Sequence, residues 1–125
     1  MPARIVLVHD DVELLQSMKV ALAGYDVAAF DNPMTALAAL QSAKLIDLLI
    51  TGLRFPAGQP NGVSLALMAT RMRPLVKVLI AAPPEDAHHA DDVGELLPYP
   101  IDLPYLVTIV RGLIGGPEAR RQPPG

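Results

Sequence analysis

Three consecutive polar residues near the start of the chain are the first that could carry chemistry. His9, Asp10 and Asp11 directly follow the apolar run IVLV at residues 5–8. An imidazole beside carboxylates suits Zn²⁺ or Mn²⁺ better than Mg²⁺, and Asp10 is the weak candidate ligand. The alternative is that Asp10 and Asp11 cap the helix that follows and favour the positive end of its dipole. A metal site needs three or more ligands, so we favour capping and expect no bound metal or other cofactor.

The other residues that could do chemistry fit no catalytic pattern. His88 and His89 are adjacent, so on a helix they point about 100° apart and cannot bind one ion together; we expect both to be exposed. Ser17, Ser42 and Ser64 fall in expected helices and not at a strand-to-helix elbow, which disfavours a Ser-His-Asp hydrolase. No glycine-rich phosphate-binding motif is present, and the first turn is acidic where a phosphate would need backbone amides. We therefore expect that this protein is not an enzyme.

The elements that must position these residues follow from short apolar runs that alternate with segments of helical periodicity. Five runs predict strands, at residues 5–8, 25–30, 46–51, 75–82 and 96–97. Four segments predict helices, at residues 14–22, 33–41, 63–72 and 103–113. This alternation predicts an α/β fold with a parallel sheet and helices on both faces. In such folds the functional residues lie at the carboxyl ends of the strands.

Composition limits the class of protein. The chain has 125 residues, of which 51% are hydrophobic and 18% charged, enough to bury one core. Mean hydropathy is +0.34, yet no apolar run approaches the roughly 18 residues of a membrane helix, and the N-terminus is unlike a secretory signal. A net charge of −3 and five Phe and Tyr residues argue against nucleic-acid binding. The absence of cysteine fits a cytoplasmic protein.

Three motifs at the expected strand ends resemble those of response-regulator receiver domains of bacterial two-component signalling. They are IVLVHDD at residues 5–11, DLLITGLRFP at residues 47–56 and YPID at residues 99–102. The resemblance covers residues 4–114 and implies a flavodoxin-like, doubly wound, five-stranded parallel sheet, the (βα)5 receiver fold, with a cis peptide before Pro100. We expect residues 1–114 to form the receiver-like domain and residues 115–125 a disordered tail.

The groups that run the family's phosphoryl transfer are mostly missing. The resemblance implies two acids that hold Mg²⁺, a phosphoacceptor Asp, a hydroxyl and a Lys around one pocket. In the same order this chain has His9 and Asp10, then Gly52, Ala81 and Tyr99. Gly52, at the phosphoacceptor position, has no side chain to phosphorylate. We therefore expect a degenerate pseudo-receiver whose acidic pocket survives as His9, Asp10 and Asp11.

Neighbouring side chains do not replace the missing acceptor. Thr51 should point to the opposite face of its strand, and Asp47 lies at the other end of that strand. Arg54 is expected to make a surface contact. The phenol of Tyr99 could enter the emptied pocket and hydrogen-bond Asp10 or His9, or the ring could simply cover the strand end. The sequence leaves both alternatives open.

The segment over residues 83–95 is shorter than the family's fourth helix and nearly devoid of large apolar side chains. A helix without an apolar stripe has little to dock it, so we expect this one to be short or irregular. Because this helix is short, apolar surface on the fifth strand and last helix should be uncovered. The residues expected to supply that interface are Leu96, Leu97, Ile101, Tyr105 and Ile109.

The expected function is that of a stand-alone receiver-like domain in phosphorelay signalling that acts by phosphorylation-independent protein–protein contact. The partner would be a histidine kinase or a downstream signalling protein, with homodimerisation as one form of contact, and neither nucleic acid nor membrane is expected. Two alternatives remain open. One is a small-ligand or metal binder that uses the vacated acidic pocket, and the other is a receiver phosphorylated at a different residue.

Overall fold

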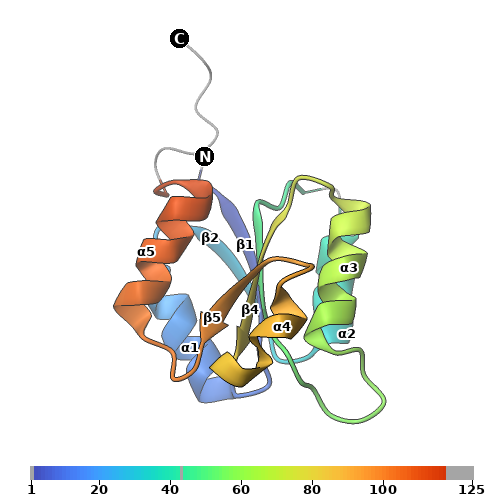
Figure 1. Ribbon diagram of the computed structural model, residues 1–125. Helices are drawn as coiled ribbons and strands as arrows, with labels where there is room; N and C mark the ends of the chain where they lie inside the picture. Colours follow the sequence, from blue (N-terminus) through green and yellow to red (C-terminus); the bar gives the residue numbers. More distant parts are fainter. Residues whose placement is uncertain (1, 43, 118–125) are drawn as a thin grey trace.

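The computed structural model describes residues 2–42 and 44–117 and contains one five-stranded parallel sheet in the order β2-β1-β3-β4-β5 (Figure 1). The strands are β1 (Arg4–Val8), β2 (Asp26–Phe30), β3 (Leu48–Gly52), β4 (Lys77–Ala82) and β5 (Glu95–Pro98). The helices are α1 (Val12–Ala21), α2 (Pro33–Leu40), α3 (Gly62–Met72), α4 (Ala87–Ala90) and α5 (Leu103–Ile114). The predicted doubly wound α/β fold is confirmed.

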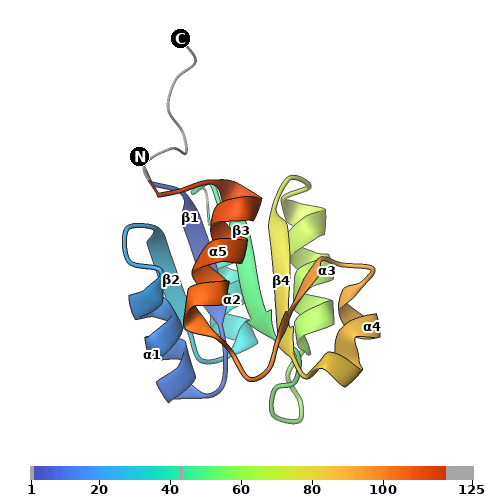
Figure 2. The ribbon, with the colours of Figure 1, turned by 60° about the vertical axis from the view of Figure 1, so that its left-hand side comes forward.

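The helices form two layers, one on each face of the sheet (Figure 2). Successive side chains of a strand point to opposite faces, so Ile5 and Leu7 join the core beneath α1 and α5, whereas Val6 and Val8 join the core beneath α2 and α3. All four are fully buried. Burial on both sides explains why the strands read as uninterrupted apolar runs.

Side-chain caps set where the four longer helices begin. Asp11 accepts a hydrogen bond from the backbone N–H of Leu14 at 3.1 Å, and Asp102 accepts one from Tyr105 at 3.2 Å. Asn32 and Asn61 cap α2 and α3 in the same way. Each cap satisfies a helix N–H that has no partner within the helix. Capping at the first helix is confirmed for Asp11, which is the N-cap residue in place of Asp10.

Two strands begin two residues later than the sequence predicts. The fourth strand begins at Lys77 and not at Leu75, because the N–H of Val76 closes a turn onto the carbonyl oxygen of Arg73 at 3.0 Å. Leu75 in that turn is 91% exposed. The third strand begins at Leu48, after Asp47 has accepted a hydrogen bond from the N–H of Arg4 at 2.8 Å. Apolar character alone therefore extended the fourth predicted strand into a turn and the third into irregular chain.

The segment between β4 and β5 is short, as predicted. It contains one 3₁₀ turn (Pro84–Asp86) followed by the single turn of α4. The chain then packs tightly against the sheet, because a Cβ added at Gly94 would lie 2.3 Å from the carbonyl oxygen of Val78. The predicted cis peptide between Tyr99 and Pro100 is also present.

The end of the described chain lies against the start of β2. The hydroxyl of Tyr25 donates a hydrogen bond to the carbonyl oxygen of Gly115 at 2.5 Å, and Pro117 approaches Gly24. The rest of the predicted disordered tail, residues 118–125, lies outside the described residues. Within those residues, no helix is long and apolar enough to cross a membrane.

Candidate functional site at the carboxyl edge of the sheet

Strand register brings four of the family positions together. Gly52 at the end of β3 is paired with Ala81 of β4. His9 follows Val8, which is paired with Thr51, so His9 reaches the level of Gly52. The N–H of Tyr99 bonds the carbonyl oxygen of Ala82 at 3.0 Å and holds Tyr99 beside the same edge. The carboxyl edge therefore assembles the four residues that the sequence placed there.

The imidazole of His9 fills the space next to Gly52. A Cβ added at Gly52 would lie 3.3 Å from Cδ2 and 3.5 Å from Nε2 of His9. The His9 residue is only 6% exposed. The region where a longer side chain at position 52 would project is thus occupied by a ring from β1. The pocket was expected to be vacant, but the His9 ring fills the part of it next to Gly52.

Two hydrogen bonds hold the His9 ring. Its Nδ1 accepts a bond from the backbone N–H of Asp11 at 3.0 Å, and its Nε2 contacts the hydroxyl oxygen of Tyr99. Because Nδ1 is an acceptor, the proton of the neutral imidazole lies on Nε2 and is donated to Tyr99. Of the two alternatives for Tyr99, the structure has the phenol inside the pocket, bound to His9.

Burial keeps both members of this pair neutral. Burial lowers the pKa of His9 below its ordinary value of 6.5, more strongly than the carboxylates of Asp10 and Asp11 raise it. Burial likewise raises the pKa of Tyr99 to about 12, and Asp10 and Asp11 add to that rise. Oδ1 of Asp10 lies 3.5 Å from Nδ1 of His9. Because the imidazole is neutral, this contact is not an ion pair.

A cleft of about 330 Å³ opens beside the pair. Its floor is apolar and its rim is charged; the lining residues are His9, Asp10, Leu53, Arg54, Ala81, Ala82, Pro83, Asp86 and Tyr99. At the rim the largely exposed Arg54 pairs with Asp86 at 3.1 Å. Asp86 was not foreseen as a site residue, because a partner 32 positions away along the chain leaves no local signal. In residues 2–42 and 44–117, no cluster of three or more His, Cys, Asp or Glu could hold a metal ion.

Thr51 and Asp47 lie away from this cleft, as predicted. Thr51 is paired with Val8 and Ile80, which belong to the core beneath α2 and α3. Asp47 precedes β3 at the amino edge, where it bonds the N–H of Arg4. The carboxylate of Asp47 and the hydroxyl of Thr51 therefore do not reach the position of Gly52.

The prediction of an exposed apolar interface on β5 and α5 is wrong in part. Leu97 is 0% exposed in the core beneath α1 and α5, and Leu96 packs against the opposite core. Ile101 and Ile109 are partly buried against the same core as Leu97. Strand alternation sends Leu96 and Leu97 to opposite faces, and each face is covered despite the short α4. Tyr105, at 45% exposure, is the one large exposed side chain of the set.

The two adjacent histidines of α4 are exposed, as expected, but their rings do not diverge. The centroids of the His88 and His89 rings lie 4.0 Å apart with an interplanar angle of 40°. The expected separation assumed a continuing helix, whereas α4 is a single turn of four residues. The two rings can therefore lean together over the end of the turn.

Comparison with solved structures identifies the architecture. A response-regulator receiver protein from Sinorhizobium medicae has a TM-score of 0.79 and 26% identity, over 90% of this chain and 94% of that one. A chemotaxis response regulator of Vibrio cholerae has a TM-score of 0.76 and 24% identity, over 90% and 99%. A receiver domain protein from Methanospirillum hungatei has a TM-score of 0.78 and 23% identity, over 90% and 93%.

The likeness to these proteins is carried by the structure. No protein-family model and no curated protein matches the sequence. Topology, the cis peptide before Pro100 and the grouping of His9, Gly52, Ala81 and Tyr99 at one edge all agree with the resemblance drawn from the sequence. The chain has the fold of response-regulator receiver domains.

Proposed function

We propose that this chain is a pseudo-receiver that works in two-component signalling through protein contact that does not depend on phosphorylation. The observation that carries the proposal is the packing of the His9 ring over Gly52, 3.3 Å from the place of a Cβ. In the family that the sequence resembles, this is the phosphoacceptor position. Here the position offers no carboxylate, and the space around it is occupied.

The remaining groups of the pocket do not suit phosphoryl transfer. The reaction needs a nucleophile, and it needs cations to balance the charge of the phosphoryl oxygens. Tyr99 stands where the family has a Lys, and a phenol with a pKa of about 12 brings no positive charge. Ala81 brings no hydroxyl, and Asp10 is the one acid retained from the family's pair. We therefore propose that the chain is not an enzyme.

The experiment is calorimetry with beryllofluoride and Mg²⁺, together with intact-mass measurement after incubation with acetyl phosphate. We expect neither binding nor a mass increase for the natural chain. The matched control restores the family set through His9→Asp, Gly52→Asp, Ala81→Thr and Tyr99→Lys together, and it should regain Mg²⁺-dependent binding. Tight Mg²⁺-dependent binding by the natural chain would contradict the proposal.

The partner is proposed to be a histidine kinase or a downstream signalling protein that recognises the α5 side of the domain. Tyr105 is the most exposed large side chain of the residues first considered there. Its replacement by Glu should weaken partner capture without unfolding the chain, whereas Ile109 is partly buried and would confound such a test. Capture should be the same with and without acetyl phosphate, because a ligand shifts an equilibrium only through differential affinity.

A small-ligand binder is the second candidate, and the cleft of about 330 Å³ beside Tyr99 is the observation in its favour. Ligand pockets combine an apolar lining with a few polar groups, and Leu53, Ala82 and Asp86 provide both characters here. A thermal-shift screen with nucleotides, amines and divalent metals distinguishes the two functions. A saturable rise in Tm that Asp86→Asn removes would favour the binder over the contact protein.

A further inference from the structure

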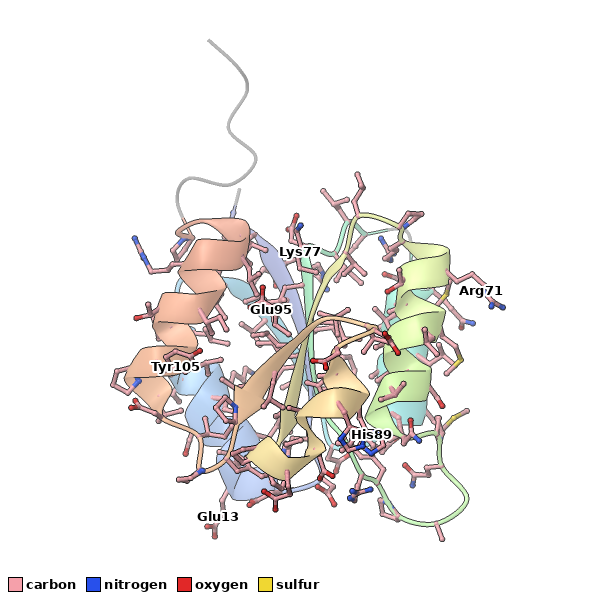
Figure 3. The ribbon with its side chains drawn as sticks, viewed as in Figure 1. Glu13, Arg71, Lys77, His89, Glu95 and Tyr105 are labelled. Atoms are coloured by element: carbon pink, nitrogen blue, oxygen red, sulfur yellow. The ribbon has the colours of Figure 1, made fainter. Side chains whose placement is uncertain are left out.

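Charge is divided between the two ends of the sheet. Among the described residues, the amino edge and the helix ends beside it carry seven basic side chains and, at the starts of strands, three acids: Arg4, Lys19, Lys44, Arg71, Arg73, Lys77 and Arg111 against Asp26, Asp47 and Glu95, with Arg4 paired to Asp26. The carboxyl edge carries seven acids: Asp10, Asp11, Glu13, Asp31, Glu85, Asp86 and Asp102. Figure 3 shows Lys77 and Arg71 toward one end and Glu13 at the other.

Helix dipoles account for part of this division. Glu13 lies in the first turn of α1, and Lys19 and Arg71 lie in the last turns of α1 and α3, where these charges are favourable. They do not account for Lys44, which precedes β3, or for Lys77, which is the first residue of β4. Nor do they account for apolar side chains left exposed at the same edge. A second physical reason is needed there.

Three of the eight exposed large apolar side chains of the described residues lie where the chain enters β3 and β4. Leu75 is 91% exposed, and Leu45 and Met72 are also exposed. The entries to the two strands are adjacent, because the N–H of Lys77 bonds the carbonyl oxygen of Asp47 at 3.1 Å. Arg73, at the end of α3, donates a hydrogen bond to the carbonyl oxygen of Leu40 at the end of α2, at 2.9 Å. Leu75 thus forms an apolar knob with Arg73 and Lys77 on either side, which we term the amino-edge knob.

The opposite edge has the complementary character. The cleft of about 330 Å³ has an apolar floor that includes Leu53, Ala82 and Pro83, and its rim carries Asp10 and Asp86. Arg54 is the sole basic residue that the described chain places at this edge, and it is paired with Asp86. An acidic rim around an apolar floor suits an apolar knob that is flanked by cations.

We propose that copies of this chain associate head to tail, with the amino-edge knob of one copy docked in the carboxyl-edge cleft of the next. Such a contact joins two different surfaces, so it produces open chains or rings and not a symmetric dimer. The proposal is independent of the proposed signalling function, because it concerns a different pair of surfaces from the α5 side. Its attraction is electrostatic in part, so salt should weaken it.

The experiment uses two variants of the full chain, each blocked at one edge. Leu75→Asp with Lys77→Glu blocks the knob, and Asp10→Lys with Glu85→Lys reverses the charge of one rim acid and of the acid next to Asp86 in the chain. Sedimentation velocity should show that the mass of the natural chain grows beyond a dimer with concentration at low salt. Each variant alone should associate at least about tenfold more weakly, as for the loss of a central contact. An equal mixture of the two should form a heterodimer and nothing larger, because one knob and one cleft remain intact.

Leu67→Asp is the control for Leu75→Asp, because Leu67 is also an exposed leucine but lies midway along α3, away from the amino edge. It should associate like the natural chain. Circular dichroism verifies folding, and Lys77→Glu alone replaces the double variant if that one unfolds. A natural chain that stays monomeric at all concentrations overturns the proposal, as does a dimer that both blocked variants retain. Binding of the monomer to phosphatidylserine vesicles through Leu75 would also overturn it in favour of a lipid surface.

Discussion

The pocket at the carboxyl edge and the segment between β4 and β5 have both lost material relative to the receiver pattern, and they have closed in different ways. In the pocket, Gly52 removes a side chain and the ring of His9 takes its place, held by Tyr99. Between β4 and β5 most of a helix is missing. There Gly94, directly before β5, lies against the carbonyl group of Val78 in the paired strand β4 and leaves no room for a side chain.

The difference shows which kind of change each region should tolerate. A side chain can rotate or shift when a neighbour grows, so the pocket has some freedom. A backbone carbonyl in a paired strand cannot move without breaking ladder hydrogen bonds. Substitutions at the two glycines therefore provide the most direct test of this comparison.

The largest effect is expected for Gly94→Ala. Its Cβ would lie 2.3 Å from the carbonyl oxygen of Val78 and 2.7 Å from the Cβ of Val78, so β4 and the start of β5 must separate. Overpacking of this kind destabilises by about 3 kcal/mol. Urea denaturation of the two proteins measures the difference. A variant as stable as the natural chain would show that this segment is as adaptable as the pocket.

Gly52→Asp should have the next largest effect. The new carboxylate must displace the His9 ring, 3.3 Å from the added Cβ, and it brings charge into an enclosed site near Asp10. We expect a loss of about 2 kcal/mol, and no labelling by acetyl phosphate, because Ala81 and Tyr99 still leave the phosphoryl oxygens without balancing groups. Gly52→Ala is the control and should cost less, since it adds bulk without charge. Rapid phosphorylation of Gly52→Asp would show that the other substitutions matter little.

Tyr99→Phe tests the hydrogen bond and leaves the ring in place. The loss of the phenol removes the partner of Nε2 of His9, and one hydrogen bond contributes about 1 kcal/mol. The cleft beside the pair limits the effect, because water in the cleft can replace the phenol as the acceptor for the Nε2–H of His9. Thermal unfolding gives the stability difference, and the His9 ring resonances in NMR report the altered environment. Unchanged resonances would mean that the two groups do not interact in solution.

The smallest expected effect is the pH dependence of the neutral pair. The pKa of His9 in the folded state lies below 6.5, so the unfolded chain binds a proton first as pH falls. Its stabilising contribution is present above pH 6.5 and is lost as pH falls through the folded pKa. The pKa of Tyr99 rises from 10.0 to about 12, so its contribution is present below pH 10 and is lost as pH rises through about 12.

Unfolding free energies measured from acid to alkaline pH test both signs. Tyr99→Phe should remove the alkaline decline that Tyr99 causes and keep the acid one. A natural chain that becomes more stable as pH falls from neutral would contradict a neutral His9, and with it the assigned direction of the bond between His9 and Tyr99.

Local signals were enough for most of the fold, and the resemblance to receiver domains supplied the site positions other than Asp86. Apolar runs located the strands because each strand is buried on both faces, and Asn32 and Asp102 marked helix starts because caps act within one turn. The predictions failed where burial depended on distant elements. Leu75 reads as strand but is exposed in a turn, and Leu97 reads as surface but is covered by α1 and α5. Neither outcome is encoded in the adjacent residues.

The sequence by itself determined that Gly52 cannot accept a phosphoryl group, because the absence of a side chain needs no structure to be known. It also determined the order of strands and helices, through periodicity and caps. Only the tertiary structure decided what replaced the lost chemistry. His9, Gly52 and Tyr99 are far apart along the chain, and their contact exists because parallel pairing brings the ends of β1, β3 and β5 to one edge. The neutral state of His9 and Tyr99 follows from that shared burial, which no single segment of the sequence contains.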